Sequence, residues 1–246
     1  MFEPRVAVAS LSGKSDADWA KQASPWAGAA FLGGLALDKQ TRTAARQMVT
    51  GRDRSEFLPE DPFGFMESEL RALDETDITP GFNVRSVDQS SLKRAAKLCA
   101  DYGAYIEINA HCRQPEMTRI GAGQALLTEP ERLANTIRTA AQTDATVSLK
   151  VRTEILGVDL QQVSQTAVEA GADILHIDAM DSESVIKDVK DRTTAFIIAN
   201  NGVRDQATAI EYLEYGADAV SVARPSTNTE VLRRVKHGVK NWFETQ

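Results

Sequence analysis

A polar amide and a thiol stand close together at the end of one strand-like run. The run YIEIN ends at Asn109, and His111 and Cys112 follow shortly after it. Its apolar and polar residues alternate as in a β-strand, and barrel enzymes keep their reactive groups at the carboxyl ends of strands. Cys112 is therefore a candidate proton donor or nucleophile, and the alternative is a small, half-buried apolar residue.

Two cations alternate on a second strand-like run. Lys150 and Arg152 lie two residues apart in the run VSLKVR. Side chains two apart on a strand point to the same face, so we expect both cations to face the interior. Such cations need an anion or an electron-rich ligand, unless ion pairs with Glu107 or Asp178 neutralise them.

Two later loops have the composition of anion-binding loops. The first, NNGVR, contains Asn201 and Gly202, and the second, ARPS, contains Ala223 and Arg224. If they follow the seventh and eighth strands of a barrel, they occupy the place where barrels bind phosphate through backbone amides and a helix N-terminus. The alternative is two ordinary turns with polar caps. Neither loop matches a Walker or dinucleotide fingerprint.

Metal and serine-nucleophile chemistry find no support in the sequence. The spacing of Cys99, His111, Cys112 and His176 matches no zinc pattern. No G-x-S-x-G elbow is present either. We therefore expect no metal site.

The elements that must position these residues repeat along the chain. Apolar runs of strand length alternate with segments of helical period, a pattern that predicts a parallel sheet covered by helices. Eight such units close most naturally into an α/β (β/α)8 TIM barrel, and a doubly wound open sheet is the alternative. We expect one domain over residues 1–246, with an inserted helical segment at about 38–79. The eight runs are residues 6–9, 29–32, 81–84, 105–108, 147–151, 174–177, 195–198 and 219–222.

Composition and charge narrow the class of protein. Hydrophobic residues at 42% and charged residues at 26% are ordinary for a globular chain. A net charge of -7 argues against wholesale electrostatic capture of nucleic acid or of an anionic membrane. Two cysteines make no disulfide framework, which favours a reducing, cytoplasmic setting. The longest nearly apolar run, residues 26–37, is too short to span a bilayer.

Several of these segments together resemble the tRNA-dihydrouridine synthases. That family shows N-x-G-C-P and, after a gap, G-A-x-x-L. Here Asn109 and Cys112 occupy the corresponding positions, and GAGQALL begins at Gly121 after a gap of eight residues. The run SLKVR is similar to the V-K-x-R strand of the family, and the loops at 198–202 and 216–224 resemble its flavin-phosphate loops.

The resemblance implies FMN as the cofactor, bound across the mouth of a TIM barrel. Lys150 would lie near the electron-rich edge of the flavin, and Asn83 stands where the family usually has a Gln that contacts it. The flavin phosphate would be held by Asn201, Gly202, Ala223 and Arg224.

The resemblance also implies a pyrimidine substrate, possibly a uridine of tRNA. Asn109 and Arg152 would contact the uracil ring. Cys112 would be the general acid that protonates C5 while hydride from reduced FMN reaches C6. This role suits a thiol, because an ordinary thiol is protonated at neutral pH.

The sequence also departs from the family pattern. His111 and Arg113 replace the Gly and Pro that flank the Cys, and Asp178 stands where the family has a phosphate-contacting His. Only residues 227–246 follow the eighth predicted strand, so the chain resembles a short, archaeal-type relative without the C-terminal helical domain that grips tRNA.

Three other functions stay open at this point. One is a flavoenzyme on a small pyrimidine, like dihydroorotate dehydrogenase, and another is a non-flavin barrel that handles a phosphorylated ligand with Lys150 as base. The third is a barrel that has lost catalysis and serves only in binding.

Overall fold

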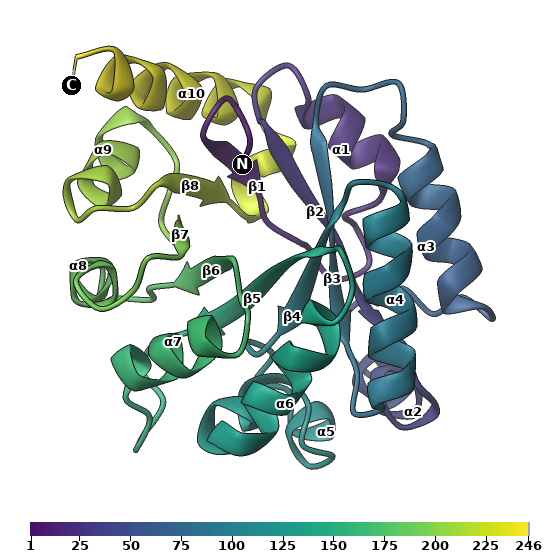
Figure 1. Cartoon of the computed structure of the whole chain (residues 1–246). Coiled ribbons are helices and arrows are strands. Elements are labelled where there is room, and N and C mark those ends of the chain that lie inside the picture. The colour runs from purple at the N-terminus through teal and green to yellow at the C-terminus, as the bar shows by residue number, and fades with distance from the viewer. Residues whose placement is uncertain (246) are drawn as a thin grey trace.

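The computed structural model describes residues 1–245 and shows a closed barrel of eight parallel strands (Figure 1). Each strand pairs with the next, and β8 pairs with β1. The TIM barrel prediction is thus confirmed, and every expected run overlaps a strand. The strands are β1 (Val6–Val8), β2 (Ala29–Ala36), β3 (Thr79–Arg85), β4 (Tyr105–Asn109), β5 (Thr146–Arg152), β6 (Ile174–Asp178), β7 (Phe196–Asn200) and β8 (Ala219–Val222).

Helices between the strands form an outer ring around the barrel (Figure 1). An Asp begins most of them, for example Asp88 and Asp205, whose carboxylates accept backbone N–H bonds of the first turn. Their apolar faces pack on the strands in one continuous core. The ring consists of α1 (Ala17–Ala23), α3 (Pro62–Arg71), α4 (Gln89–Asp101), α6 (Pro130–Ala141), α7 (Leu160–Glu169), α8 (Val185–Lys190), α9 (Gln206–Glu214) and α10 (Thr229–Glu244).

The expected insertion at about residues 38–79 contains two helices, which lie in different parts of the fold. Helix α3 lies in the outer ring, whereas α2 (Lys39–Val49) packs against α5 (Pro115–Thr118) in the loop after β4 (Figure 1). Met48 of α2 and Met117 of α5 share an apolar cluster with Cys112. Helix α2 therefore supports the loop that carries the thiol.

The side chains inside the barrel are apolar near the amino ends of the strands and polar further along them. Phe31 and Tyr105 belong to an apolar cluster with Phe2. Glu107 and His176, further along β4 and β6, are both fully buried. Side chains two apart on a strand share a face, so the interior becomes polar toward the carboxyl ends of the strands.

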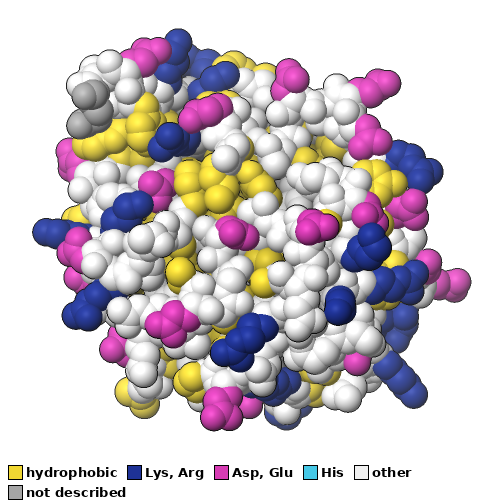
Figure 2. Space-filling model, viewed as in Figure 1, with side chains coloured by type: hydrophobic (Ala, Val, Ile, Leu, Met, Phe, Trp, Pro, Cys, Tyr) yellow, Lys and Arg dark blue, Asp and Glu magenta, His cyan; other side chains and the backbone are white. Residues whose placement is uncertain are grey.

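The outer surface is mixed in charge. Lys and Arg side chains lie among Asp and Glu side chains on the face seen in Figure 2. Within residues 1–245, no helix has the length and apolar character needed to cross a membrane.

Candidate active site

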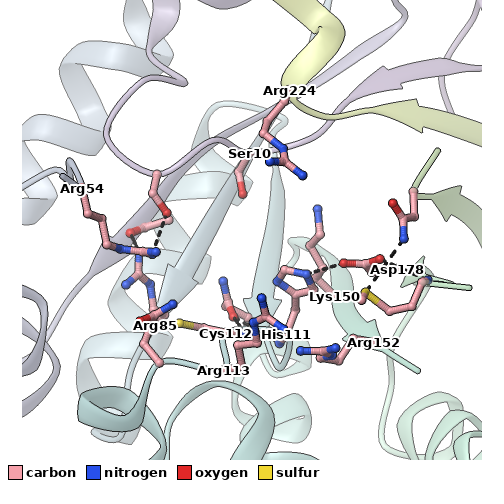
Figure 3. A pocket seen from close by; sticks show the side chains of 16 residues that line it. Ser10, Arg54, Arg85, His111, Cys112, Arg113, Lys150, Arg152, Asp178 and Arg224 are labelled. Carbon is pink, nitrogen blue, oxygen red and sulfur yellow. Dashed lines mark hydrogen bonds and ion pairs between the residues drawn. The ribbon is translucent and has the colours of Figure 1, made fainter. Parts of the chain in front are cut away.

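Two adjoining cavities open at the carboxyl ends of the strands. The first has a volume of about 470 Å³ and the second about 530 Å³, and both are lined by Lys150, Asp178, Asn201 and Arg224. These volumes fall within the usual size of small-molecule and cofactor sites. The first cavity is also lined by Asn109 at the end of β4, by Cys112 in the following loop and by Arg152 at the end of β5. Figure 3 shows Cys112 and Arg152 in this lining.

Asn109 fixes the loop that carries Cys112, which comprises residues 110–114 between β4 and α5 and is called the thiol loop below. Its Oδ1 accepts the backbone N–H of Cys112 at 2.8 Å and that of His111 at 3.2 Å. Its Nδ2 donates to Oδ1 of Asn83 at 2.8 Å. The loop is closed from the other side by Gln124, whose N–H donates to the Cys112 carbonyl at 2.9 Å. Asn109 is thus a structural anchor for Cys112, whatever it contacts in the cavity.

A chain of buried hydrogen bonds continues from Asn109 into the barrel. Asn83 Nδ2 donates to Oε1 of Glu107 at 2.7 Å. The other carboxylate oxygen of Glu107 lies 2.6 Å from Nδ1 of His176, whose Nε2 lies 2.7 Å from Oγ of Ser221. Burial raises the pKa of Glu107, but the His176 and Lys150 side chains outweigh it and hold that pKa below its usual value.

His176 completes this network as a neutral ring. Burial and the charge of Lys150 lower the pKa of His176, although the carboxylate of Glu107 opposes them. A proton on Nδ1 then donates to Glu107, and Nε2 accepts from the Ser221 hydroxyl. The network gives the buried carboxylate the partners it requires.

The acid at the end of β6 has a partner from the thiol loop. Nε2 of His111 lies 2.5 Å from Oδ2 of Asp178, and both residues line the two cavities. Burial raises the pKa of Asp178, but this hydrogen bond and the nearby charges of His111 and Lys150 lower it overall. His111 thus offsets a carboxylate that would otherwise repel an anion.

A second ion pair ties β3 to the loop after α2. Arg85 is only 2% exposed, and its Nη2 donates to Oε2 of Glu56 at 2.5 Å and to the carbonyl of Gly34. Arg54 shares the same carboxylate at 2.7 Å. Arg54 and Arg85 both line the first cavity.

Most cations of the two cavities have no such partner. Within residues 1–245, no ion pair closer than 4 Å involves Arg113, Lys150, Arg152 or Arg224. The alternative, in which Lys150 and Arg152 form ion pairs with Glu107 or Asp178, is therefore wrong, because no such pair lies within 4 Å. Burial lowers the pKa of Lys150, although Glu107 and Asp178 act in the opposite direction.

Eight of the nine predicted site residues line the two cavities, and Asn83 does not. Asn109, Cys112 and Arg152 line the first, Gly202 and Ala223 the second, and Lys150, Asn201 and Arg224 both. Asn83 is fully buried on the same interior face of the sheet as Glu107. Its amide already serves Glu107 and Asn109, so its predicted contact with a flavin has no support in the lining.

Several residues of the site could not be predicted from the sequence. Neither the role of Glu56 nor the pairing of His111 with Asp178 was expected from the sequence. Asp and Glu residues that neutralise buried arginines leave no local signal, because the partners lie far apart in the chain. Across residues 1–245, no three His, Cys, Asp or Glu side chains are grouped as metal ligands.

Solved structures with the same architecture confirm the fold alone. A FabK mutant from Thermotoga maritima superposes with a TM-score of 0.59 at 14% identity, covering 92% of this chain and 62% of that one. The tryptophan synthase complex from Pyrococcus furiosus gives a TM-score of 0.62 at 11% identity, covering 98% of this chain and 100% of that chain.

Sequence relatives are more informative. An uncharacterized protein of Methanocaldococcus jannaschii is 28% identical over 234 residues, which cover 91% of this chain and 89% of that protein. The tRNA-dihydrouridine synthase B of Proteus vulgaris is 28% identical over 222 residues, covering 81% of this chain and 68% of that enzyme. The family model described as dihydrouridine synthase matches residues 67–243, well over half of the sequence. The chain therefore belongs to the dihydrouridine synthase family and is an oxidoreductase.

Proposed function

We propose that this oxidoreductase binds FMN across the two cavities and reduces the C5–C6 double bond of a uracil ring, with Cys112 as the proton donor. The observation that carries the proposal is the convergence of a thiol, an anchoring amide and unpaired cations at one barrel mouth. A uridine of tRNA is the first substrate to test, because the Proteus relative carries that activity in its name.

The residues of the second cavity suit the phosphate and the flavin ring. Arg224 and Lys150 have no ion-pair partner among the described residues, and Gly202 lies in a turn with a φ of 66° that leaves backbone amides accessible. Asp178 would repel a phosphate, but its contact with His111 offsets that charge. Lys150, Asn201, Gly202, Ala223 and Arg224 would hold the cofactor, and reduced FMN would supply the hydride that reaches C6.

Cys112 and its neighbours would handle the proton. The S–H bond of Cys112 breaks as a C5–H bond forms on the ring, and the thiolate that remains regains a proton from water. The two backbone N–H bonds to Asn109 keep the thiol loop in place during this step. Arg152, which is 8% exposed and lines the first cavity, would contact the uracil carbonyls.

A small anionic pyrimidine is the second candidate substrate. Six Lys or Arg residues line the first cavity against one acid, Asp178. This excess suits a carboxylated pyrimidine as well as a nucleotide, because both carry a negative charge near the ring.

Flavin binding is the first test. We expect the purified protein to bind FMN with a shift of the flavin absorbance bands. Lys150→Ala and Arg224→Ala should each weaken binding by about tenfold or more, which corresponds to about 1.4 kcal/mol. Arg233→Ala is the matched control, because Arg233 lies on α10, is exposed and pairs only with Glu230.

The outcome then directs the substrate assay. If FMN binds, reduction of uridine in tRNA is compared with reduction of free uracil and orotate, and loss of turnover in Cys112→Ala is expected. No binding at saturating FMN would overturn the proposal and favour a barrel for another phosphorylated ligand.

A further inference from the structure

A buried cation lies beside the thiol, and the reaction outlined above gives it no task. Arg85 ends β3 and lines the first cavity together with Cys112. Figure 3 shows the Cys112 sulfur turned toward the Arg85 side chain. Nη1 of Arg85 also lies 3.9 Å from Sδ of Met48, which packs in the same apolar cluster as Cys112.

The guanidinium of Arg85 is only partly satisfied. Its Nη2 donates to Glu56 and to the Gly34 carbonyl, but its Nε is buried without a partner in the described structure. An unpaired donor at a buried site is energetically costly, so native proteins seldom keep one without a use. This Nε–H donor is therefore not taken up by Glu56 or by the Gly34 carbonyl.

The local charge balance is positive. The Glu56 side chain is 1% exposed, and its one carboxylate serves both Arg85 and Arg54. Burial lowers the pKa of Arg85, but the charge and hydrogen bond of Glu56 raise it, so the guanidinium stays protonated. Two arginines against one carboxylate leave a net cation beside the thiol.

We infer that Arg85 is a positioning residue for the Cys112 reaction, a fixed cation that stabilises the thiolate left when Cys112 gives its proton to C5. This inference rests on the proposed function. Thiolates form more readily next to Arg or Lys, and a preorganised charge is most effective where water is excluded. The ion pair with Glu56 keeps the Arg85 guanidinium in place and partly neutralises its charge.

Other charged groups also surround the thiol loop, and the test must separate Arg85 from them. They come from the thiol loop itself, from the ends of β5, β6 and β8 and from the loop after α2. They are His111, Arg113, Lys150, Arg152, Asp178, Arg224, Arg54 and Glu56.

The test is the pH dependence of alkylation of Cys112 by iodoacetamide, followed by peptide mass spectrometry. Cys99 serves as an internal control, because it is fully buried in α4 and burial raises its pKa far above the usual range. In Arg85→Gln the midpoint of the reactivity curve should rise by about one pH unit or more. Arg85→Lys keeps the charge and should stay close to the wild type.

Glu56→Gln gives the opposite test. Its amide can still accept bonds from Arg85 and Arg54, so the loop should remain folded. With the countercharge gone, the midpoint for Cys112 should fall. A purely structural role would move the midpoint in the same direction in both Arg85→Gln and Glu56→Gln. If Arg85→Gln does not fold, the directions in Glu56→Gln and Arg85→Lys decide.

Equal shifts in the two Gln variants, no shift in either, or no alkylation of the wild type up to about pH 10 would overturn the inference. The assay needs neither flavin nor substrate. A negative result with intact FMN binding and uracil reduction would therefore reject the role of Arg85 and leave the proposed function standing.

Discussion

Gly123 is the residue on which the geometry of the thiol loop depends most directly. Its φ of 64° is in the left-handed region, and a Cβ there would collide with the carbonyl oxygen of Cys112. The same carbonyl accepts the N–H of Gln124 at 2.9 Å. Any side chain at this position would therefore displace the loop that holds the thiol.

We predict that Gly123→Ala destabilises the protein more than a matched glycine does. Gly103 has nearly the same φ, 62°, but nothing lies within 4 Å of a Cβ built there. Gly103→Ala should cost about 1 to 2 kcal/mol from backbone strain alone. Gly123→Ala should cost about 2 to 5 kcal/mol, because overpacking adds to the strain. Urea unfolding measures both, and equal costs would show that the loop yields without strain.

At the scale of elements, the loop after β4 meets the end of β6 at the mouth of the two cavities. His111 follows β4 and Asp178 ends β6, and their side chains meet at 2.5 Å. The two strands are separated by β5, so this contact crosses one strand at the barrel mouth.

We predict that His111→Asn weakens FMN binding by about tenfold, or about 1.4 kcal/mol, because Asp178 is then an uncompensated carboxylate. The double variant His111→Asn with Asp178→Asn should recover most of the affinity, since the repulsive charge is gone. Titration calorimetry of the two variants measures this. A double variant as weak as the single one would mean that His111 contacts the ligand itself.

The elements were more predictable than these contacts. All eight strands follow from apolar runs between helical segments, yet β2 continues to Ala36 where the apolar pattern predicted an end at residue 32. Gly33 and Gly34 reduce strand propensity, but here both have positive φ and shift the register against β3. A glycine pair alone does not distinguish a bulge from a turn.

The orientation of a site residue was predictable where it lies on a strand, because side chains on a strand alternate between the two faces. Lys150 and Arg152 line the cavity, as the alternation in β5 requires. The pairs of His111 with Asp178 and Arg85 with Glu56 were not predictable, because each joins a strand end to a loop whose shape depends on the closed barrel. Asn109 shows the same limit, since its bonds to the thiol loop follow from a turn after the strand.

At the scale of the whole molecule, the chain has a negative net charge, but the cavity at the mouth of the barrel is lined mainly by cations. The net charge is -7, whereas the first cavity has six Lys or Arg residues and one acid in its lining. The buried network of Glu107 and His176 lies beneath this mouth and joins strands that are distant in the sequence. The stability of the barrel is therefore linked to the protonation of its interior.

We predict that the free energy of unfolding falls as the pH is lowered from about 7 to 4. Burial and the charge of Lys150 lower the pKa of His176. His176 and Lys150 lower the pKa of Glu107, and His111 and Lys150 lower the pKa of Asp178, in both cases against the effect of burial. The unfolded chain regains ordinary pKa values, so it binds more protons than the folded chain below about pH 6.5 for His176, about pH 4.5 for Glu107 and about pH 3.8 for Asp178. Folding is then disfavoured by about 1.4 kcal/mol for each unit of pKa difference.

Urea unfolding between pH 7.5 and 4 measures this dependence, and His176→Gln is the variant that isolates its upper part. The variant should be less stable at pH 7.5, because Glu107 and Ser221 lose their bonds to the imidazole. Its stability should nevertheless change less than that of the wild type between pH 7.5 and 5, since the titrating ring is gone. A wild type with constant stability over that range would mean that the buried histidine takes up its proton in the folded barrel as easily as in the unfolded chain.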